Sequence, residues 1–122
     1  MRFARYSFLA AGTVGILVLA PMYFLLEKTG ADSPPPINHP EFYYGFIGVA
    51  LAFQLVFLMI ATDPLKFRPL MLAGIVEKFL FVIPTFYLYW QGKVHGSIVG
   101  GAALDLVWGI LFVVSYLRVG RK

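Results

Sequence analysis

Residues 42–61 read FYYGFIGVALAFQLVFLMIA, a run of twenty residues without a charged side chain. An α-helix rises about 1.5 Å per residue, so about 20 apolar residues are needed to cross the hydrocarbon core of a bilayer. The run lacks the alternation of apolar and polar residues that is typical of a membrane β-strand. This stretch therefore predicts a transmembrane helix.

Three further apolar runs of similar length lie at residues 7–26, 70–90 and 97–117. The first run is uncharged, the second contains Glu77 and Lys78, and the third contains Asp105. Short connections favour antiparallel packing of consecutive helices. We therefore predict an all-α membrane protein, with residues 1–122 forming a single domain of four transmembrane helices in an up-down-up-down bundle.

The composition agrees with a membrane protein and excludes several other classes. Hydrophobic residues make up 60% of the chain and charged residues 13%, about half the charged fraction of a typical soluble domain. A disordered chain would need low hydrophobicity and high charge. The chain has no cysteine, which excludes disulfide bonds, thiolate zinc sites and iron–sulfur clusters. No motif requires a cofactor, and none is predicted.

The first run and the connection after it contain most of the proline residues. Arg2 and Arg5 precede the first run as in a signal peptide, but its length and the lack of a cleavage site predict a retained helix. Pro21 is expected to bend this helix rather than end it. Residues 27–41 contain the run 34–36 of three prolines, which predicts an extended and stiff connection.

Lysine and arginine predict the orientation, because positively charged flanks stay in the cytoplasm. Seven such residues lie on the side of the termini and two on the other side: Arg2, Arg5, Lys66, Arg68, Arg118, Arg121 and Lys122 against Lys28 and Lys93. Both termini are thus predicted to be cytoplasmic. Topology accounts for the net charge of +4, so we expect the lipid bilayer as a partner and no nucleic acid.

Four polar residues fall inside the predicted spans: Gln54, Glu77, Lys78 and Asp105. A charged side chain at the centre of a bilayer costs about 2.5 to 3.5 kcal/mol, so each needs a partner or a function. The helical rise places Gln54, Glu77 and Lys78 at similar depth, and we expect a hydrogen bond between Gln54 and Glu77. Asp105 lies nearer the outside, so a direct salt bridge to Lys78 is possible but is not the default arrangement. Lys78 is expected to reach a carboxylate or a backbone carbonyl.

Two interpretations of these residues stay open. They form a ligand or proton site, or they form a polar clasp that holds the helices in register. For a site, we expect a cavity beside Asp105, with Trp108, Thr85 and Tyr89 as further candidate residues. The tyrosines near the outer ends, Tyr89 among them, also fit an aromatic belt at the membrane interface.

The glycines of the second span and the histidines between the spans are further candidates for binding. The second span carries Gly45 and Gly48 on one side, which offers a surface for a homodimer or another membrane subunit. His39, His95 and Glu41 are zinc or copper ligand types, but their spacing matches no motif and no metal site is predicted.

Several short motifs resemble small, largely uncharacterised bacterial four-helix membrane proteins of the broadly DoxX-like group. The motifs are HPEFYYGF at residues 39–46, the turn from Asp63-Pro64 to Arg68-Pro69, Glu77-Lys78, and DLVWG at residues 105–109. The resemblance implies a four-helix bundle in a bacterial plasma membrane. The lack of cysteine argues against a thiol-redox role.

Three functions are compatible with these features. The leading hypothesis is a non-catalytic, multi-pass membrane protein that binds a lipophilic small molecule or a partner membrane subunit. The second is a proton-coupled transporter or channel that uses Glu77 or Asp105. The third is a lipid-modifying enzyme in which the same carboxylates act as general acid and base.

Overall fold

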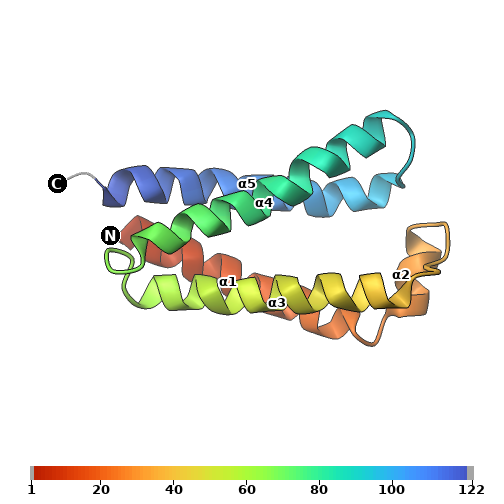
Figure 1. Ribbon diagram of the computed structural model, residues 1–122, viewed down its shortest axis with the longest axis horizontal. Coiled ribbons are helices and arrows are strands. Elements are labelled where there is room, and N and C mark those ends of the chain that lie inside the picture. Colours follow the sequence, from red (N-terminus) through yellow and green to blue (C-terminus); the bar gives the residue numbers. More distant parts are fainter. Residues whose placement is uncertain (1, 121–122) are drawn as a thin grey trace.

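Residues 2–120 are described by a computed structural model, in which they form five helices and no strand (Figure 1). The helices are α1 (Arg2–Met22), α2 (Leu26–Asp32), α3 (Pro40–Thr62), α4 (Arg68–Trp90) and α5 (Gly96–Val119). All except α2 are long and apolar enough to cross a membrane. The predicted all-α class with four such helices is confirmed. Arg121 and Lys122, which entered the orientation prediction, lie outside the described residues.

The first helix and its connection differ from the prediction. Helix α1 ends at Met22, one residue beyond Pro21, so the predicted continuation to residue 26 is wrong. The segment 27–41 is not extended throughout, because α2 covers its first half. The sequence supports α2 through Glu27 in its first turn and a pair between Lys28 and Asp32, whose charged atoms lie 2.6 Å apart. Residues 33–39, which include the three consecutive prolines, are non-helical, and α3 begins at Pro40.

The long helices form two pairs, because α1 packs along α3 and α4 packs along α5. The pairs join where α1 contacts α5 and α3 contacts α4. Figure 1 places the start of α1, the end of α5 and the α3–α4 turn together at one end of the molecule, which we call the closed end. Helix α2 and the α4–α5 turn lie at the other end, which we call the open end, and the two pairs diverge toward it.

Three fully buried phenylalanines, Phe8, Phe57 and Phe112, fill the space between the pairs at the closed end. The rings of Phe8 and Phe112 stack with centroids 4.0 Å apart, and Phe57 meets Phe112 edge-on at 4.8 Å. These rings come from α1, α3 and α5. Helix α4 joins them through Gly74, where a Cβ would lie 2.9 Å from the Phe57 ring. All four long helices therefore meet at one aromatic cluster.

Two arginines fasten the helix ends beyond this cluster. The Arg5 Nε donates a hydrogen bond to the Ala61 carbonyl in the last turn of α3, at 3.2 Å. The Arg68 Nε donates to the Tyr116 carbonyl in the last turn of α5, at 3.0 Å, and its guanidinium lies over the Tyr116 ring. The last carbonyls of a helix have no partner within it and carry partial negative charge, so a cation stabilises them.

Helices α1 and α3 approach closely because α1 presents small residues. A Cβ on Gly12 would lie 2.9 Å from the backbone oxygen of Gln54, and a Cβ on Gly15 would overlap the Gln54 side chain. The small residues of α3 contribute less, since Gly45 has no neighbour within 4 Å of an added Cβ.

The substitution Gly12→Ala tests this close approach. We expect the added methyl group to push α1 away from the Gln54 backbone and to lower the free energy of unfolding by about 1–3 kcal/mol. Gly100→Ala is the matched control, because nothing lies within 4 Å of a Cβ there. Alanine should leave stability unchanged at that position or raise it by about 0.5–1 kcal/mol. Unfolding in bicelles measures both, and equal effects would contradict the packing described.

Candidate functional site

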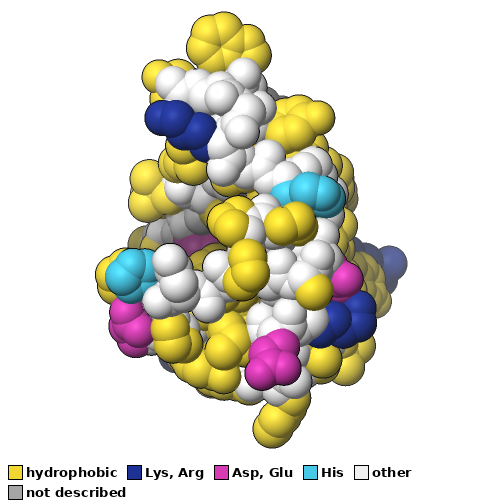
Figure 2. Space-filling view, turned by 90° about the vertical axis from the view of Figure 1, so that its right-hand side faces the viewer, with side chains coloured by type: hydrophobic (Ala, Val, Ile, Leu, Met, Phe, Trp, Pro, Cys, Tyr) yellow, Lys and Arg dark blue, Asp and Glu magenta, His cyan; other side chains and the backbone are white. Residues whose placement is uncertain are grey.

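A cavity of about 450 Å³ lies between the two helix pairs, within the range of small-molecule sites, which is about 300–1,000 Å³. Its walls are mostly apolar side chains from all the helices. The residues that line it include Gly15, Leu19, Met22, Thr29, Ser33, Tyr43, Phe46, Gln54, Glu77, Lys78, Phe81, Ser97, Ile98, Gly101, Asp105 and Trp108. Figure 2 faces the open end and shows a hollow with an acidic side chain visible at its floor.

Hydrogen bonds around the mouth of the cavity hold α2 and the proline-rich connection in place. The Tyr43 hydroxyl donates to the Met22 carbonyl at 2.7 Å and lies 3.2 Å from the Thr29 hydroxyl. The hydroxyls of Ser33 and Ser97 lie 2.5 Å apart and link the connection to α5. The mouth is therefore framed by residues far apart in the sequence.

The deep end of the cavity holds an ammonium group between two carboxylates. The Lys78 Nζ lies 3.3 Å from the Asp105 Oδ1 and 3.5 Å from the Glu77 Oε2. It also lies 5.2 Å from the centre of the Phe57 ring, a distance that allows a cation–π interaction. The Lys78 side chain is 5% exposed, against 17% for Glu77 and 25% for Asp105. The carboxylates offset much of the cost of burying this cation.

Lys78 reaches a carboxylate, as expected, and that of Asp105 is the partner that the depth estimate allowed but did not favour. The depth estimate ignored how closely α4 and α5 approach. A Cβ on Gly109 would lie 3.3 Å from the Lys78 Cβ, so this glycine lets the two backbones come together. At that separation the four-carbon stem of lysine spans the difference in depth and also reaches back to Glu77.

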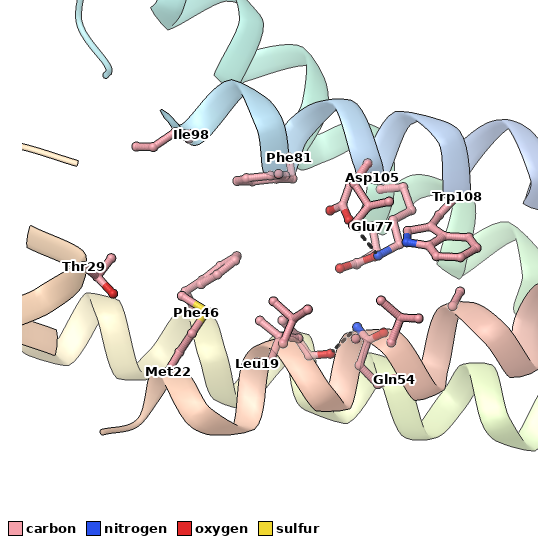
Figure 3. A pocket seen from close by; sticks show the side chains of 18 of the residues that line it. Leu19, Met22, Thr29, Phe46, Gln54, Glu77, Phe81, Ile98, Asp105 and Trp108 are labelled. Atoms are coloured by element: carbon pink, nitrogen blue, oxygen red, sulfur yellow. Dashed lines mark hydrogen bonds and ion pairs between the residues drawn. The ribbon is translucent and has the colours of Figure 1, made fainter. Parts of the chain in front are cut away.

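Gln54 does not bond to Glu77, so the predicted hydrogen bond between these two side chains is wrong. The Gln54 Nε2 donates to the Ala50 carbonyl one turn earlier in α3, at 2.8 Å. In Figure 3, Gln54 projects from one wall of the cavity while Glu77, Asp105 and Trp108 project from the opposite side. Gln54 and Glu77 thus line the same space from different helix pairs without touching through a hydrogen bond.

Two buried acceptor atoms at this depth have no hydrogen-bond partner among the described residues. They are the Gln54 Oε1 and the Glu77 Oε2, the second of which has only its 3.5 Å ion contact with Lys78. Gln54 is 1% exposed. A buried polar group without a hydrogen bond is costly, typically by about 1–3 kcal/mol, so these two acceptors call for a partner such as a bound water or a ligand.

The other predicted site residues are Trp108, Thr85 and Tyr89, and only the first of them lines the cavity. Trp108 lines the cavity beside the charged cluster, whereas Thr85 and Tyr89 do not line it. Thr85 is buried in α4, and Tyr89 is about half exposed near the end of the same helix. The apolar wall supplied by α1 was not predicted, because in the sequence its apolar residues cannot be distinguished from residues that face lipid.

The histidines lie outside the cavity, at the open end. The His39 Nδ1 lies 3.1 Å from the Glu41 Oε1, and the His95 Nδ1 accepts a hydrogen bond from the Ser97 backbone at the start of α5. Within residues 2–120, no three histidine, aspartate or glutamate side chains converge in a way that could hold a metal ion.

No model of a known protein family, no curated protein and no solved structure matches this chain. The DoxX-like resemblance therefore stays a prediction.

A double-mutant cycle tests whether Lys78 and Asp105 are energetically coupled. Lys78→Met leaves two carboxylates without their cation, and Asp105→Asn removes one carboxylate. We expect each variant to be less stable and the double variant to lose less than the sum, with a coupling of about 1–3 kcal/mol. Unfolding in bicelles measures the cycle, and Lys93→Met in the exposed α4–α5 turn is the control. Additive losses would contradict the pairing.

Proposed function

We propose that this chain is an integral membrane protein that binds a lipophilic small molecule in the cavity between its helix pairs. The observation that carries the proposal is the layout of that cavity. Mostly apolar walls extend from the hydroxyl groups at the mouth to the charged cluster and Gln54 at the deep end (Figure 3). An amphiphile has the complementary form, because its apolar body would lie along the walls and its polar group would reach the cluster.

We further propose that the four long helices cross the bilayer in up-down-up-down order, with both termini in the cytoplasm. The support is the distribution of cations among the described residues. Those near the closed end are Arg2, Arg5, Lys66, Arg68 and Arg118. Lys28 and Lys93 lie near the open end. Under the positive-inside rule the cavity then opens to the outside. The DoxX-like resemblance favours a bacterial plasma membrane.

Proton-coupled transport is the second candidate function. The observation in its favour is the buried Glu77 Oε2, which has no hydrogen-bond partner and lies beside a cation in a cavity open at one end. Transport also requires a route through the closed end, where the three phenylalanines fill the space. A proton flux into liposomes that is lost in Glu77→Gln, while the fold is retained, would favour this candidate over simple binding.

Tryptophan fluorescence tests the binding proposal. The chain has two tryptophans, and Trp90 is largely exposed, so Trp90→Phe leaves Trp108 as a reporter in the cavity. We expect 1-dodecanol, added to this variant in lipid nanodiscs, to shift the emission of Trp108 with a saturable dependence on its mole fraction in the lipid.

The matched controls are Gly101→Leu and Gly100→Leu in the same background. Both glycines are exposed and have open space around an added Cβ, but only Gly101 lines the cavity. Leucine at position 101 should therefore occupy the cavity and abolish the saturable shift, whereas leucine at position 100 should preserve it. An identical, unsaturable response in all three proteins would indicate partition into lipid alone and would contradict the proposal.

A further inference from the structure

We infer that the cavity selects lipophilic molecules whose polar group donates hydrogen bonds, a primary ammonium or a hydroxyl group, over those with a carboxylate or an ester. This inference rests on the proposed binding function and names the class of ligand. It follows from which hydrogen-bonding atoms at the deep end of the cavity already have partners.

The donors at this depth are largely committed to partners within the protein. The Lys78 ammonium is shared between Asp105 and Glu77, and the Gln54 Nε2 donates to the Ala50 carbonyl. The indole N–H of Trp108 is a further donor at this end. The N–H groups left over are one on the Lys78 ammonium, one on the Gln54 amide and that of the Trp108 indole, and a ligand carboxylate that accepted from them would still lie beside the carboxylates of Glu77 and Asp105.

Two hydrogen-bond acceptors at the deep end of the cavity, in contrast, lack hydrogen-bond partners. The Gln54 Oε1 is buried and has no hydrogen-bond partner, and the Glu77 Oε2 has none besides its ion contact with Lys78. These two atoms belong to opposite walls of one cavity (Figure 3). A ligand group that donates hydrogen bonds would satisfy whichever of these acceptors it reaches. A group that can only accept would leave both unsatisfied.

The charges favour the same ligands. Two carboxylates face one ammonium at the deep end, so a ligand carboxylate placed there would meet two like charges. A ligand ammonium would instead meet a surplus of acceptors and could bond to a carboxylate, the stronger kind of hydrogen bond. The apolar walls toward the mouth, among them Leu19, Phe46 and Ile98, would take an alkyl chain or a ring system.

A matched series of probes with one chain length tests the selectivity. Dodecylamine, 1-dodecanol, methyl dodecanoate and dodecanoic acid differ in the polar group and share an alkyl chain of similar length. Each is titrated into the Trp90→Phe protein in nanodiscs and compared at equal mole fraction in the lipid. We expect the amine and the alcohol to bind at least about tenfold more tightly than the ester or the acid.

Glu77→Gln provides a second test, because a glutamine at this position supplies a donor as well as an acceptor. In this variant the preference for the alcohol over the ester should shrink by several-fold. Trp108 fluorescence also reports whether the variant retains its fold and its response to 1-dodecanol.

The outcomes separate this inference from the function on which it rests. If the ester or the acid binds as tightly as the alcohol, with a shift that Gly101→Leu abolishes, the cavity binds lipophiles but the inferred selectivity is wrong. If none of the four probes gives a shift that depends on Gly101, the binding function itself is contradicted, and the inference with it.

Discussion

The ammonium group of Lys78, held between the carboxylates of Asp105 and Glu77, is the constraint on which the rest of the molecule depends. Each of these groups is costly to place among apolar helices, by about 2.5–3.5 kcal/mol at the centre of a bilayer. The cost falls only if α4 and α5 approach closely enough for the lysine to reach Asp105, at 3.3 Å. Gly109 permits that approach. The charged cluster and the packing of α4 on α5 are therefore two consequences of one requirement.

The helix pairs can then meet along only part of their length. At the closed end, apolar residues from all four long helices fill the space, and Arg5 and Arg68 bond to the last carbonyls of α3 and α5. Toward the open end, the charged cluster on one pair faces Gln54 on the other without a hydrogen bond between them. A cavity remains there, and its polar groups lie at its floor. The position of the cluster thus determines both the place of the cavity and its chemistry.

Much of the fold could be predicted from the sequence because each long helix contains a mostly apolar run of about 20 residues, the length that crosses the hydrocarbon core of a bilayer. Helix α2 was not predicted, because the prolines at 34–36 indicated an extended connection over the whole of residues 27–41. Glu27 and the Lys28–Asp32 pair nevertheless support a short helix there. The intramembrane charges were identified because they are rare in such runs. The partners of these charged residues were not identified, because the depth of a residue along its helix does not show how closely two helices approach. That distance depends on Gly109, which looks like any other small residue in the sequence.

The proposed function requires that a ligand occupies the space between the helix pairs and bonds to the polar side chains at its deep end. The most direct measurement is an experimental density map of the protein extracted with its native lipids, at a resolution that separates an alkyl chain from water. We predict elongated density along the apolar walls, with one end within hydrogen-bond distance of the Gln54 Oε1 or the Glu77 carboxylate. A map in which α1 and α5 close the space, or in which Gln54 and Glu77 bond to each other across it, would contradict the proposed function.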